Sequence, residues 1–417
     1  MRILFVHQNF PGQFKHLAPA LVARGHEVHA LTINQQAPLL GVVVHRYKVG
    51  RGSSADIHPW VVDIETKVLR GEACAKAAHQ LKGAGFVPDV IYAHPGWGEA
   101  LFLREVWPDV RQLHYVEFFY AAVGADVGFD PEFGLPDWSM RSRVRLKNTN
   151  NLLNLNVMDQ GVSPTHWQCS TVPEKYREAI TVIHDGVDTE IVKPDSAARF
   201  SWRSEDGRDL EVSAGDPVLT FVNRNLEPSR GYHVFMRSLP ELLFRHPKLQ
   251  ILIVGGDDVS YGARPDSGSY KQRFLVEVED RIDPARVHFL GRIPYAKYIK
   301  LLQVSMAHVY LTYPFVLSWS MLEAMSAGCL VIGSRTPPVE EVIVDGENGL
   351  LVEFGSPMQI ADAVTRVLSK PEGMGDIRKR ARNAVLLNYD LRTQCLPKQI
   401  ELIEKLAAVD RCQKLPI

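Results

Sequence analysis

Two arginines in the second half of the chain have the types and spacing of a diphosphate-binding loop. Arg224 and Arg230 follow an apolar run, 218–222, and Gly231 comes directly before a segment with apolar residues at helical spacing. Two guanidinium groups can neutralise a leaving diphosphate, and the N-terminus of a helix adds the positive end of its dipole. The pattern therefore predicts a strand, a cationic loop and a helix that together hold a diphosphate. The alternative is a turn that carries two surface arginines.

A carboxylate, Glu323, lies in a second stretch with a chemical pattern. Residues 308–333 predict a buried strand, a loop, a helix over 320–327 ended by Gly328, and a second buried strand. We expect Glu323 in the first turn of this helix, at the edge of a parallel sheet where ligands bind. There it can accept hydrogen bonds from a ribose diol while backbone N–H groups take up phosphate oxygens. The alternative is that it only complements the helix dipole.

Two stretches resemble the donor-site signature of the family 4 retaining glycosyltransferases. The first, 313–334, contains Met-Leu-Glu323-Ala-Met-Ser-Ala-Gly328, and the second, 341–352, is Glu-Val-Ile-Val-Asp-Gly-Glu-Asn-Gly-Leu-Leu-Val. The resemblance covers nearly the whole chain and is most specific over 221–352. It implies an α/β protein of GT-B architecture, with two Rossmann-like βαβ domains facing across a cleft. It also implies transfer of a sugar from a nucleoside-diphosphate sugar to an acceptor hydroxyl, with retention of configuration.

The sequence departs from the family pattern at three places, one of them a pair of residues. Phe315 stands where the family usually carries a glutamate, eight residues before Glu323. Ser318 stands where a glycine is usual, and a Pro-Pro pair at 337–338 takes the place of two glycines. In the family the missing glutamate contacts the donor sugar, so we expect Phe315 at the substrate, where the change bears on sugar identity and on activity.

The resemblance assigns roles to particular residues. Arg224 and Arg230 match the family's Arg and Lys, with one extra residue between them, and form the predicted catalytic group with Glu323. Gly12 lies in the first loop, 7–14, where the alternative is a plain turn glycine. The segment 287–294 resembles the backbone that holds the nucleobase edge. The residues predicted to hold the donor are Gly12, Gly256, Arg292, Ile293, Ser318, Trp319 and Ser320.

Two polar residues at strand ends in the first half are candidates for substrate contacts. His94 follows the predicted strand 88–93, and Glu117 ends the strand 112–117. The carboxyl ends of parallel strands meet at one edge of a sheet, where loops carry function. The resembled family lines its acceptor pocket along this edge, so we expect His94 and Glu117 to contact the acceptor or the donor. The alternatives are a histidine bonded to its own loop and a carboxylate that caps a helix or pairs with a cation.

The elements that must position these residues alternate between strand and helix in both halves of the chain. We expect a Rossmann-like acceptor domain over 1–193, completed by a C-terminal helix at about 390–417, and a nucleotide-sugar donor domain over 210–388. The polar stretch 193–216, punctuated by Pro and Gly, predicts a linker with a small hairpin. The first loop lacks the G-x-G-x-x-G fingerprint, which disfavours a Rossmann dehydrogenase.

The composition is that of an ordinary globular protein with two domains. Its 417 residues are 46% hydrophobic and carry 47 basic and 48 acidic side chains, so no overall positive charge favours nucleic acid as a partner. The cysteines form no C-x-x-C pair, which predicts reduced thiols in the cytoplasm. No apolar run reaches the roughly 18 residues of a membrane span. The basic residues over 141–147 predict a solvated helix, with peripheral contact to an anionic membrane as the alternative.

The predicted function is sugar transfer from a nucleoside-diphosphate sugar, in cell-surface or secondary glycan synthesis. The acceptor stays open among a glycan, a lipid-linked substrate, a protein and a small molecule. Asp257 and Asp258 have no third ligand in view, so we expect no metal and no cofactor beyond the donor. Two other functions share the fold. One is a sugar-nucleotide epimerase or phosphorylase, and the other is a degenerate transferase kept as a non-catalytic binding partner, which Phe315 favours.

Overall fold

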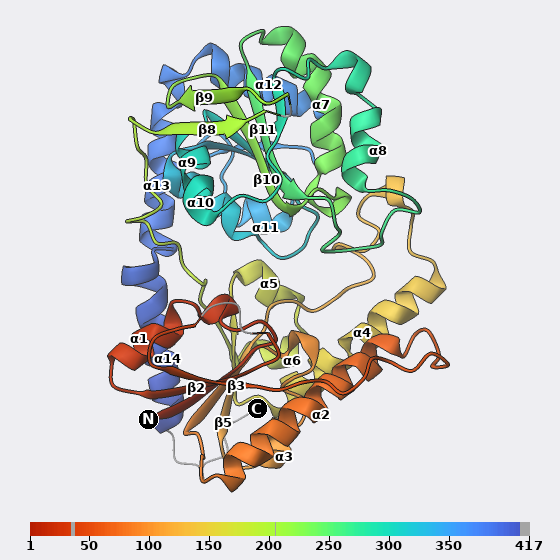
Figure 1. Ribbon diagram of the computed structural model, residues 1–417, viewed down its shortest axis with the longest axis vertical. Coiled ribbons are helices and arrows are strands. Elements are labelled where there is room, and N and C mark those ends of the chain that lie inside the picture. Colours follow the sequence, from red (N-terminus) through yellow and green to blue (C-terminus); the bar gives the residue numbers. More distant parts are fainter. Residues whose placement is uncertain (35–37, 205, 409–417) are drawn as a thin grey trace. The chain divides into compact units, whose positions relative to one another are not determined.

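The computed structural model describes residues 1–34, 38–204 and 206–408, and these residues form two α/β units (Figure 1). None of the helices in these ranges has the length and apolar character that a membrane span requires. The prediction of two Rossmann-like domains is confirmed, because each unit is built around its own parallel sheet.

The chain passes between the units more than once. Of the described residues, unit 1 contains those of 1–128, 134–186 and 392–408. Unit 2 contains residues 187–391 and a short segment, 129–133. This short segment packs within unit 2 although the chain on either side of it belongs to unit 1.

Seven parallel strands form the sheet of unit 1, in the order β3-β2-β1-β4-β5-β6-β7. This is a Rossmann-type order, with its topological switch point between β1 and β4. The strands are β1 (Arg2–Val6), β2 (Glu27–Thr32), β3 (Val42–Arg46), β4 (Val90–Ala93), β5 (Arg111–Tyr115), β6 (Gln160–Ser163) and β7 (Ile180–Val182). The helices are α1 (Leu17–Ala23), α2 (Val62–Gly83), α3 (Leu103–Val106), α4 (Trp138–Val157), α5 (His166–Thr171), α6 (Glu174–Arg177) and α14 (Leu396–Ala408).

Strand β1 shows how one apolar run builds two core layers. Successive side chains of a strand point to opposite faces. Ile3 and Phe5 enter one buried cluster, which includes side chains of α1 and α14. Leu4 and Val6 enter another, which includes side chains of α2 and α3. A strand that is apolar at consecutive positions is therefore buried on both faces, as a parallel sheet covered by helices requires.

Unit 2 has a six-stranded parallel sheet in the order β12-β11-β10-β13-β14-β15, with its switch point between β10 and β13. The strands are β10 (Val218–Asn225), β11 (Gln250–Gly256), β12 (Val287–Phe289), β13 (Ala307–Tyr310), β14 (Leu330–Ser334) and β15 (Leu350–Val352). The helices are α7 (Tyr232–Arg245), α8 (Tyr270–Val276), α9 (Tyr295–Val304), α10 (Trp319–Ala327), α11 (Pro337–Glu340), α12 (Pro357–Ser369) and α13 (Gly375–Asn388).

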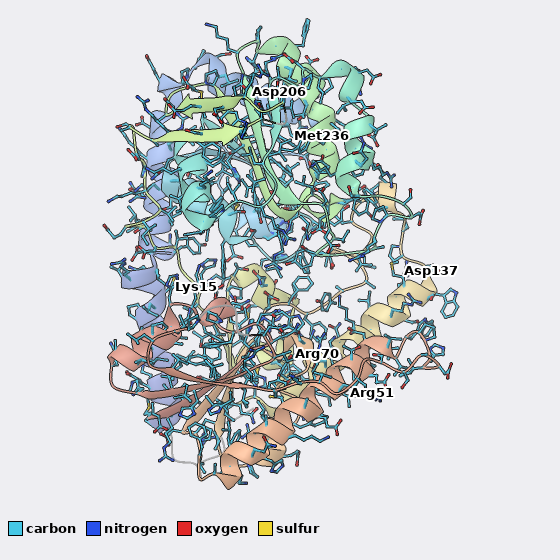
Figure 2. All side chains as sticks on the ribbon, viewed as in Figure 1. Lys15, Arg51, Arg70, Asp137, Asp206 and Met236 are labelled. Atoms are coloured by element: carbon cyan, nitrogen blue, oxygen red, sulfur yellow. The ribbon has the colours of Figure 1, made fainter. Side chains whose placement is uncertain are left out.

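The predicted hairpin is present between the linker and this sheet. Strands β8 (Arg199–Arg203) and β9 (Asp209–Ser213) pair antiparallel and form a separate two-stranded sheet. Asp206 lies in the turn between them (Figure 2). Its Oδ2 accepts a hydrogen bond from Arg208 Nε at 2.8 Å. Phe200 and Trp202 of β8 pack in the same core cluster as α9 and α10, so the hairpin is part of unit 2.

Candidate functional site

The loop after β10 has the form that the sequence predicted. It contains a 3₁₀ turn, Pro228–Arg230, and ends at Gly231, which has φ +69° and lies directly before α7. A Cβ atom at Gly231 would lie 2.3 Å from Leu311 Cβ, so only glycine fits between this loop and the chain after β13. The loop therefore lies at the carboxyl end of a central strand and at the N-terminus of a helix, where anions bind.

Arg230 is buried in this loop and joins it to the chain after β13. Its Nη1 donates to Thr312 Oγ1 at 2.8 Å and to the Val316 carbonyl oxygen at 3.1 Å, and lies 3.4 Å from Tyr310 Oη. The residue is only 6% exposed. Within the described part of the chain, its Nε and Nη2 donate to no acceptor. The guanidinium is therefore anchored on one side and can bind an anion on the other.

Arg224 has different surroundings. Strand β10 extends to Asn225, three residues beyond the predicted end at 222, and its register is irregular between Val222 and Asn225. Arg224 thus lies in the strand end, with an exposed side chain. The structure gives it no hydrogen bond or ion pair to another residue of the described ranges. Both arginines belong to one strand-loop segment, but they have no described contact with each other.

Glu323 lies one residue further into its helix than predicted. Helix α10 begins at Trp319, so Glu323 is in its second turn, and the prediction of a first-turn position is wrong. The cause is Ser318, whose Oγ lies 3.4 Å from the backbone N of Ser320 and starts the helix one residue early. Glu323 is therefore too far along the helix to serve mainly as a dipole partner, because that effect is confined to the first turn.

Two tyrosines of α9 hold the Glu323 carboxylate. Tyr295 Oη donates to Oε1 at 2.7 Å, and Tyr298 Oη donates to Oε2 at 2.8 Å. Burial and the neighbouring carboxylate raise the pKa of both phenols, so both keep their protons and act as donors. Each carboxylate oxygen retains a further lone pair, which can accept a hydroxyl. Sequence reasoning missed these partners, although their spacing of three places both on one face of a helix.

An aromatic corner occupies the position where the family usually carries its first glutamate. Phe315 is 6% exposed, and its ring lies 4.8 Å from that of Tyr261. The Arg230 guanidinium carbon lies 5.4 Å from the Tyr261 ring and 5.9 Å from the Phe315 ring. Glu227, which the sequence did not single out, accepts from the backbone N–H groups of Ser260 and Tyr261 at 2.8 and 3.1 Å. Glu227 thereby fixes Tyr261 beside Arg230.

Three residues meet at the end of β11. Arg292 Nη2 donates to Asn225 Oδ1 at 3.0 Å. A Cβ atom at Gly256 would lie 2.6 Å from that oxygen and 2.8 Å from Arg292 Nε, so the contact requires glycine. Ile293 packs against the core cluster of α9 and α10. Gly256 and Arg292, both predicted to hold the donor, are therefore close together, and Arg292 is already partly engaged.

The acidic residues considered for a metal are paired with cations. Asp258 Oδ1 accepts from Arg264 Nη2 at 2.9 Å, and Asp257 lies 3.8 Å from Lys271 Nζ. These contacts give both carboxylates a structural role at the edge of the loop that follows β11.

A second acidic group lies elsewhere in unit 2. Asp130, Glu132 and His233 have potential ligand atoms within 4.8 Å of one another. Asp130 Oδ2, however, accepts from His233 Nε2 at 2.9 Å and from Tyr313 Oη at 3.2 Å. Glu132 accepts two hydrogen bonds from Arg237, at 2.6 and 2.8 Å. We interpret this group as a polar network that fixes the segment carrying Asp130 within unit 2.

In unit 1, His94 and Glu117 lie close together after β4 and β5. His94 Nδ1 accepts from the Gly96 N–H at 3.2 Å, and Nε2 lies 3.7 Å from Glu117 Oε2. The His94 ring is buried and stacks on Trp97 and Tyr115, with centroids 4.3 and 5.2 Å away. The predicted pair therefore exists at the carboxyl edge of the sheet, and part of the alternative also holds, because His94 bonds to its own loop.

Gly12 gives room to another histidine at this edge. Gly12 has φ +49°, and a Cβ atom there would lie 2.4 Å from the His7 ring. His7 Nε2 lies 2.8 Å from Gln13 Oε1, and burial lowers the pKa of His7 to about 3. His7 and His94 meet edge to face, with ring centroids 5.3 Å apart. Gly12 is therefore needed for the packing of His7, and its predicted role in holding the donor stays a prediction.

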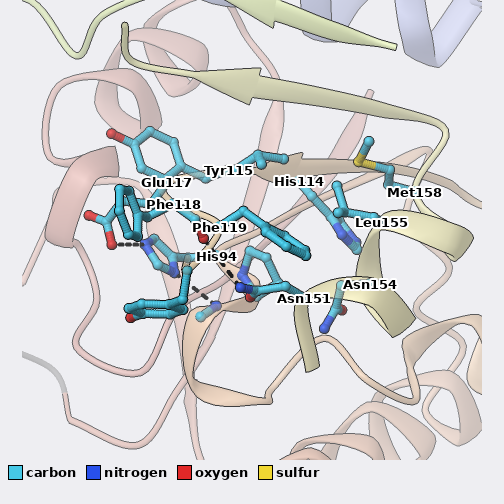
Figure 3. Close-up of a pocket in the computed structure, with 14 residues that line it drawn as sticks. His94, His114, Tyr115, Glu117, Phe118, Phe119, Asn151, Asn154, Leu155 and Met158 are labelled. Carbon is cyan, nitrogen blue, oxygen red and sulfur yellow. Dashed lines mark hydrogen bonds and ion pairs between the residues drawn. The ribbon is translucent and has the colours of Figure 1, made fainter. Parts of the chain in front are cut away.

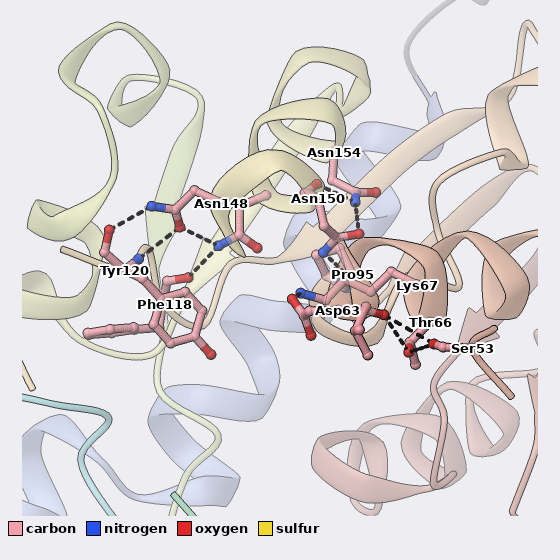
Figure 4. Close-up of polar contacts among 12 residues, drawn as sticks. Ser53, Asp63, Thr66, Lys67, Pro95, Phe118, Tyr120, Asn148, Asn150 and Asn154 are labelled. Atoms are coloured by element: carbon pink, nitrogen blue, oxygen red, sulfur yellow. Dashed lines mark hydrogen bonds and ion pairs between the residues drawn. The ribbon is translucent and has the colours of Figure 1, made fainter. Parts of the chain in front are cut away.

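A pocket opens beside His94 within unit 1 (Figure 3). It is a small space lined by residues of three stretches, 94–96, 114–120 and 151–158. Asparagines of α4 hold its wall in place (Figure 4). Asn148 pairs with both backbone groups of Tyr120, at 2.6 and 3.0 Å, and Asn150 Nδ2 donates to the Pro95 carbonyl at 2.9 Å.

The structure brings some of the predicted site residues together and leaves others apart. In unit 2, Tyr310 Oη joins the Arg230 loop to the start of α10, the helix that carries Glu323, because it lies 3.4 Å from Arg230 Nη1 and accepts from Ser318 N at 2.8 Å. Arg224 and the pair of Gly256 and Arg292 have no described contact with Arg230 or Glu323. In unit 1, His94 and Glu117 lie together beside the pocket.

Comparisons with known proteins agree with this fold. A model described as "Glycosyl transferase family 4 group" matches residues 24–192, and one described as "Glycosyl transferases group 1" matches residues 203–384. A D-inositol 3-phosphate glycosyltransferase of Acidothermus cellulolyticus is 25% identical over 217 residues, 51% of this chain and 46% of that protein. One from Corynebacterium jeikeium is 28% identical over 290 residues, 67% of this chain and 64% of that protein. The alignment spans about half the length of the Acidothermus relative.

Solved structures show the same architecture. Sucrose-phosphate synthase from Thermosynechococcus elongatus superposes with a TM-score of 0.73 at 19% identity, over 98% of this chain and all of that one. Anabaena HepE in complex with UDP superposes with a TM-score of 0.65 at 14% identity, over 97% of this chain and all of that one. These likenesses establish the fold, and the two family models cover most of both units. The chain belongs to the family 4 glycosyltransferases of GT-B fold.

Proposed function

We propose that this protein transfers a sugar from a nucleoside-diphosphate donor to an acceptor hydroxyl, with retention of configuration. The observation that carries the proposal is Arg230. Its guanidinium is buried and anchored through Nη1, and it keeps Nε and Nη2 for an anion beside the N-terminus of α7. A cation held in this way needs no reorganisation when negative charge develops, which is the condition for efficient electrostatic catalysis.

Sugar transfer from such a donor requires the protein to stabilise the departing diphosphate. As the bond between the anomeric carbon and the diphosphate oxygen breaks, the sugar becomes oxocarbenium-like and the diphosphate gains charge. Arg230 supplies a fixed positive charge, and the exposed Arg224 can swing toward the same anion. Two arginines and a helix N-terminus can take the place of a divalent cation, so we propose that the reaction needs no metal.

The donor nucleotide is proposed to lie between the Arg230 loop and Glu323. The Glu323 carboxylate, fixed by Tyr295 and Tyr298, presents two acceptor oxygens at the spacing of a vicinal diol, which fits a ribose. HepE, which shares the fold, has been solved with UDP, so uridine diphosphate is the first nucleotide to test. Phe315 gives the sugar an apolar neighbour where the family usually offers a carboxylate.

The acceptor is proposed to bind in unit 1, at the edge that carries His94 and Glu117. Curated relatives are named for D-inositol 3-phosphate, which makes a small polyol one candidate beside a glycan, a lipid-linked substrate or a protein. A role in glycan synthesis is compatible with any of these.

Calorimetric binding of UDP, GDP, ADP and TDP to the full chain tests the proposal. We expect one diphosphate to bind with a Kd that changes less than twofold between magnesium and EDTA. Arg224→Ala should weaken that binding at least tenfold, whereas the control Arg366→Ala, which removes an exposed arginine of α12, should not. The anomeric proton coupling of the glycosylated product, measured by NMR, then reports retention or inversion.

The other outcomes identify the competing functions. Binding of no diphosphate would favour the non-catalytic partner, for which the replacement of a family glutamate by Phe315 is the specific observation. Release of an epimerised nucleotide sugar would favour the epimerase.

A further inference from the structure

A short segment of the chain, 129–133, packs in unit 2 although the residues on either side of it belong to unit 1. Phe129 packs on the ring of Tyr313, with the ring centroids 5.1 Å apart. Phe133 meets the ring of His233 edge to face, with the centroids 5.2 Å apart. Both phenylalanines pack against the core cluster that contains side chains of α7 and α12. The segment is therefore anchored in the core of unit 2 near each of its ends.

The carboxylate of Asp130 lies between these two anchors in sequence and accepts hydrogen bonds from the same two residues. Its Oδ2 accepts from His233 Nε2 at 2.9 Å and from Tyr313 Oη at 3.2 Å. The side chains of Asp130 and His233 are only 11% and 2% exposed, so water competes little for this contact. Burial opposes ionisation, but the hydrogen bonds from His233 and from the Glu132 N–H hold the pKa of Asp130 below its usual range. Asp130 therefore acts as a charged acceptor, which makes the stronger kind of hydrogen bond.

Both partners of Asp130 belong to the structure that holds Arg230. The Tyr313 N–H donates to the carbonyl oxygen of Ser229, the middle residue of the 3₁₀ turn before α7, at 2.9 Å. Thr312, the residue before Tyr313, accepts from Arg230 Nη1 at 2.8 Å. His233 is the second residue of α7, at the helix end where an anion binds. Asp130 is therefore connected to the Arg230 turn through Tyr313 and to the N-terminus of α7 through His233.

We propose that Asp130 is a positioning residue for the transfer reaction. It holds Tyr313 and His233 so that the Arg230 turn and the N-terminus of α7 keep the geometry that binds the diphosphate. The inference rests on the proposed function for the identity of that anion. Asp130 and His233 are 103 residues apart in sequence. The donor site of unit 2 thus depends on a segment that the chain supplies between two stretches of unit 1.

The same segment offers a matched control in Glu132. Its carboxylate accepts two hydrogen bonds from Arg237, at 2.6 and 2.8 Å. Both side chains of this pair are about one-third exposed, and pairs with such exposure contribute little to stability. Among the described residues, no side-chain hydrogen bond joins Glu132 or Arg237 to the Arg230 turn. Glu132→Ala therefore perturbs the segment without breaking the connection through Asp130.

Hydrogen–deuterium exchange of the full chain without nucleotide, read by mass spectrometry, tests whether Asp130 holds the turn. Asp130→Ala should raise the exchange rates of peptides that cover 228–235 and 310–316 about fivefold, because local opening becomes easier when a buried contact is lost. Glu132→Ala should leave these rates within about twofold of wild type. Faster exchange confined to 129–133 in Asp130→Ala would show that Asp130 fixes only its own segment, and would overturn the inference.

Calorimetry with UDP, GDP, ADP and TDP connects this result to the donor site. Asp130→Ala should weaken the binding of the diphosphate that wild type prefers by about tenfold, the effect of losing one hydrogen bond to a charged group, and Glu132→Ala by less than about twofold. Tyr313→Phe, which removes the hydroxyl that donates to Asp130, should also weaken binding. Adding Tyr313→Phe to Asp130→Ala should change the Kd by less than about twofold, because the acceptor is already absent.

Circular dichroism verifies the fold of each variant. If Asp130→Ala folds poorly, Tyr313→Phe alone decides the inference, because it should speed exchange in the same peptides and weaken the same Kd. Full additivity of the two substitutions would overturn the connection through Tyr313, and an unchanged Kd in Asp130→Ala would remove Asp130 from the reaction. Binding of no diphosphate by the wild-type protein would contradict the proposed function instead, and the exchange rates would still decide whether Asp130 holds the Arg230 turn.

Discussion

Replacement of Arg224 and of Arg230 by alanine should affect stability and turnover differently. Arg230 is buried and its Nη1 makes hydrogen bonds of 2.8 and 3.1 Å, whereas Arg224 is exposed and has no described partner. Arg230→Ala should therefore lower both stability and turnover. Arg224→Ala should lower turnover alone.

The expected magnitudes follow from these contacts. A hydrogen bond from a charged donor contributes about 1.5–3 kcal/mol, and two bonds from one nitrogen are not additive, so Arg230→Ala should cost about 3 kcal/mol of unfolding free energy. An exposed substitution usually stays within about 0.5 kcal/mol, which is the expectation for Arg224→Ala. Loss of one transition-state donor lowers kcat by roughly 10²–10³, and we expect that range for Arg224→Ala.

Urea unfolding followed by circular dichroism, and initial rates with the donor identified by calorimetry, measure the two quantities. Thr312→Val is a matched control, because it removes the 2.8 Å acceptor of Arg230 and leaves the guanidinium in place. It should cost about 1 kcal/mol and retain most of the turnover. Equal losses of stability for the two arginine variants would refute the assigned anchoring role. Unchanged turnover for Arg224→Ala would remove Arg224 from the site.

The remaining predictions concern two carboxylates, Glu323 and Glu99. Glu323→Gln should chiefly raise the donor KM. Tyr298→Phe should also raise the donor KM, about tenfold with kcat nearly unchanged, because it removes a hydrogen-bond donor that fixes the Glu323 carboxylate. Equal KM values for Tyr298→Phe and wild type would disprove that Tyr298 acts through Glu323. Burial raises the pKa of Glu99 from 4.5 to about 7, so the folded state binds this proton more tightly than the unfolded chain. The associated stability is present below pH 4.5 and is lost as the pH rises to about 7, by about 3 kcal/mol. The unfolding free energy of Glu99→Gln, measured by urea titration and compared with wild type, should therefore rise by about 3 kcal/mol between pH 4.5 and 7. A difference between the two proteins that does not change with pH would contradict the raised pKa of Glu99.

Local patterns in the sequence were sufficient for the fold class and for the position of the main loop. Gly328 adopts the positive φ that its predicted place at the C-terminus of α10 requires. The strand, loop and helix around Arg230 follow from a buried apolar run, a turn and helical periodicity, all within a few residues of one another. Helix ends were less certain, because the cap at Ser318 moved the start of α10 and placed Glu323 in the second turn.

The tertiary structure decided how each predicted residue is held. Arg230 and Thr312 are 82 residues apart in sequence, and Tyr298 is 25 residues from Glu323, so no local pattern could pair them. The same applies to the lining of the unit 1 pocket, since His114 and Asn154 come from β5 and α4. Secondary structure depends on neighbouring side chains and is readable from sequence, whereas the partners of a buried polar group depend on which elements the fold brings together. The sequence by itself therefore determined the family, the elements and most of the candidate residues of this protein. Only the packing of those elements decided which of these residues are anchored and which are available.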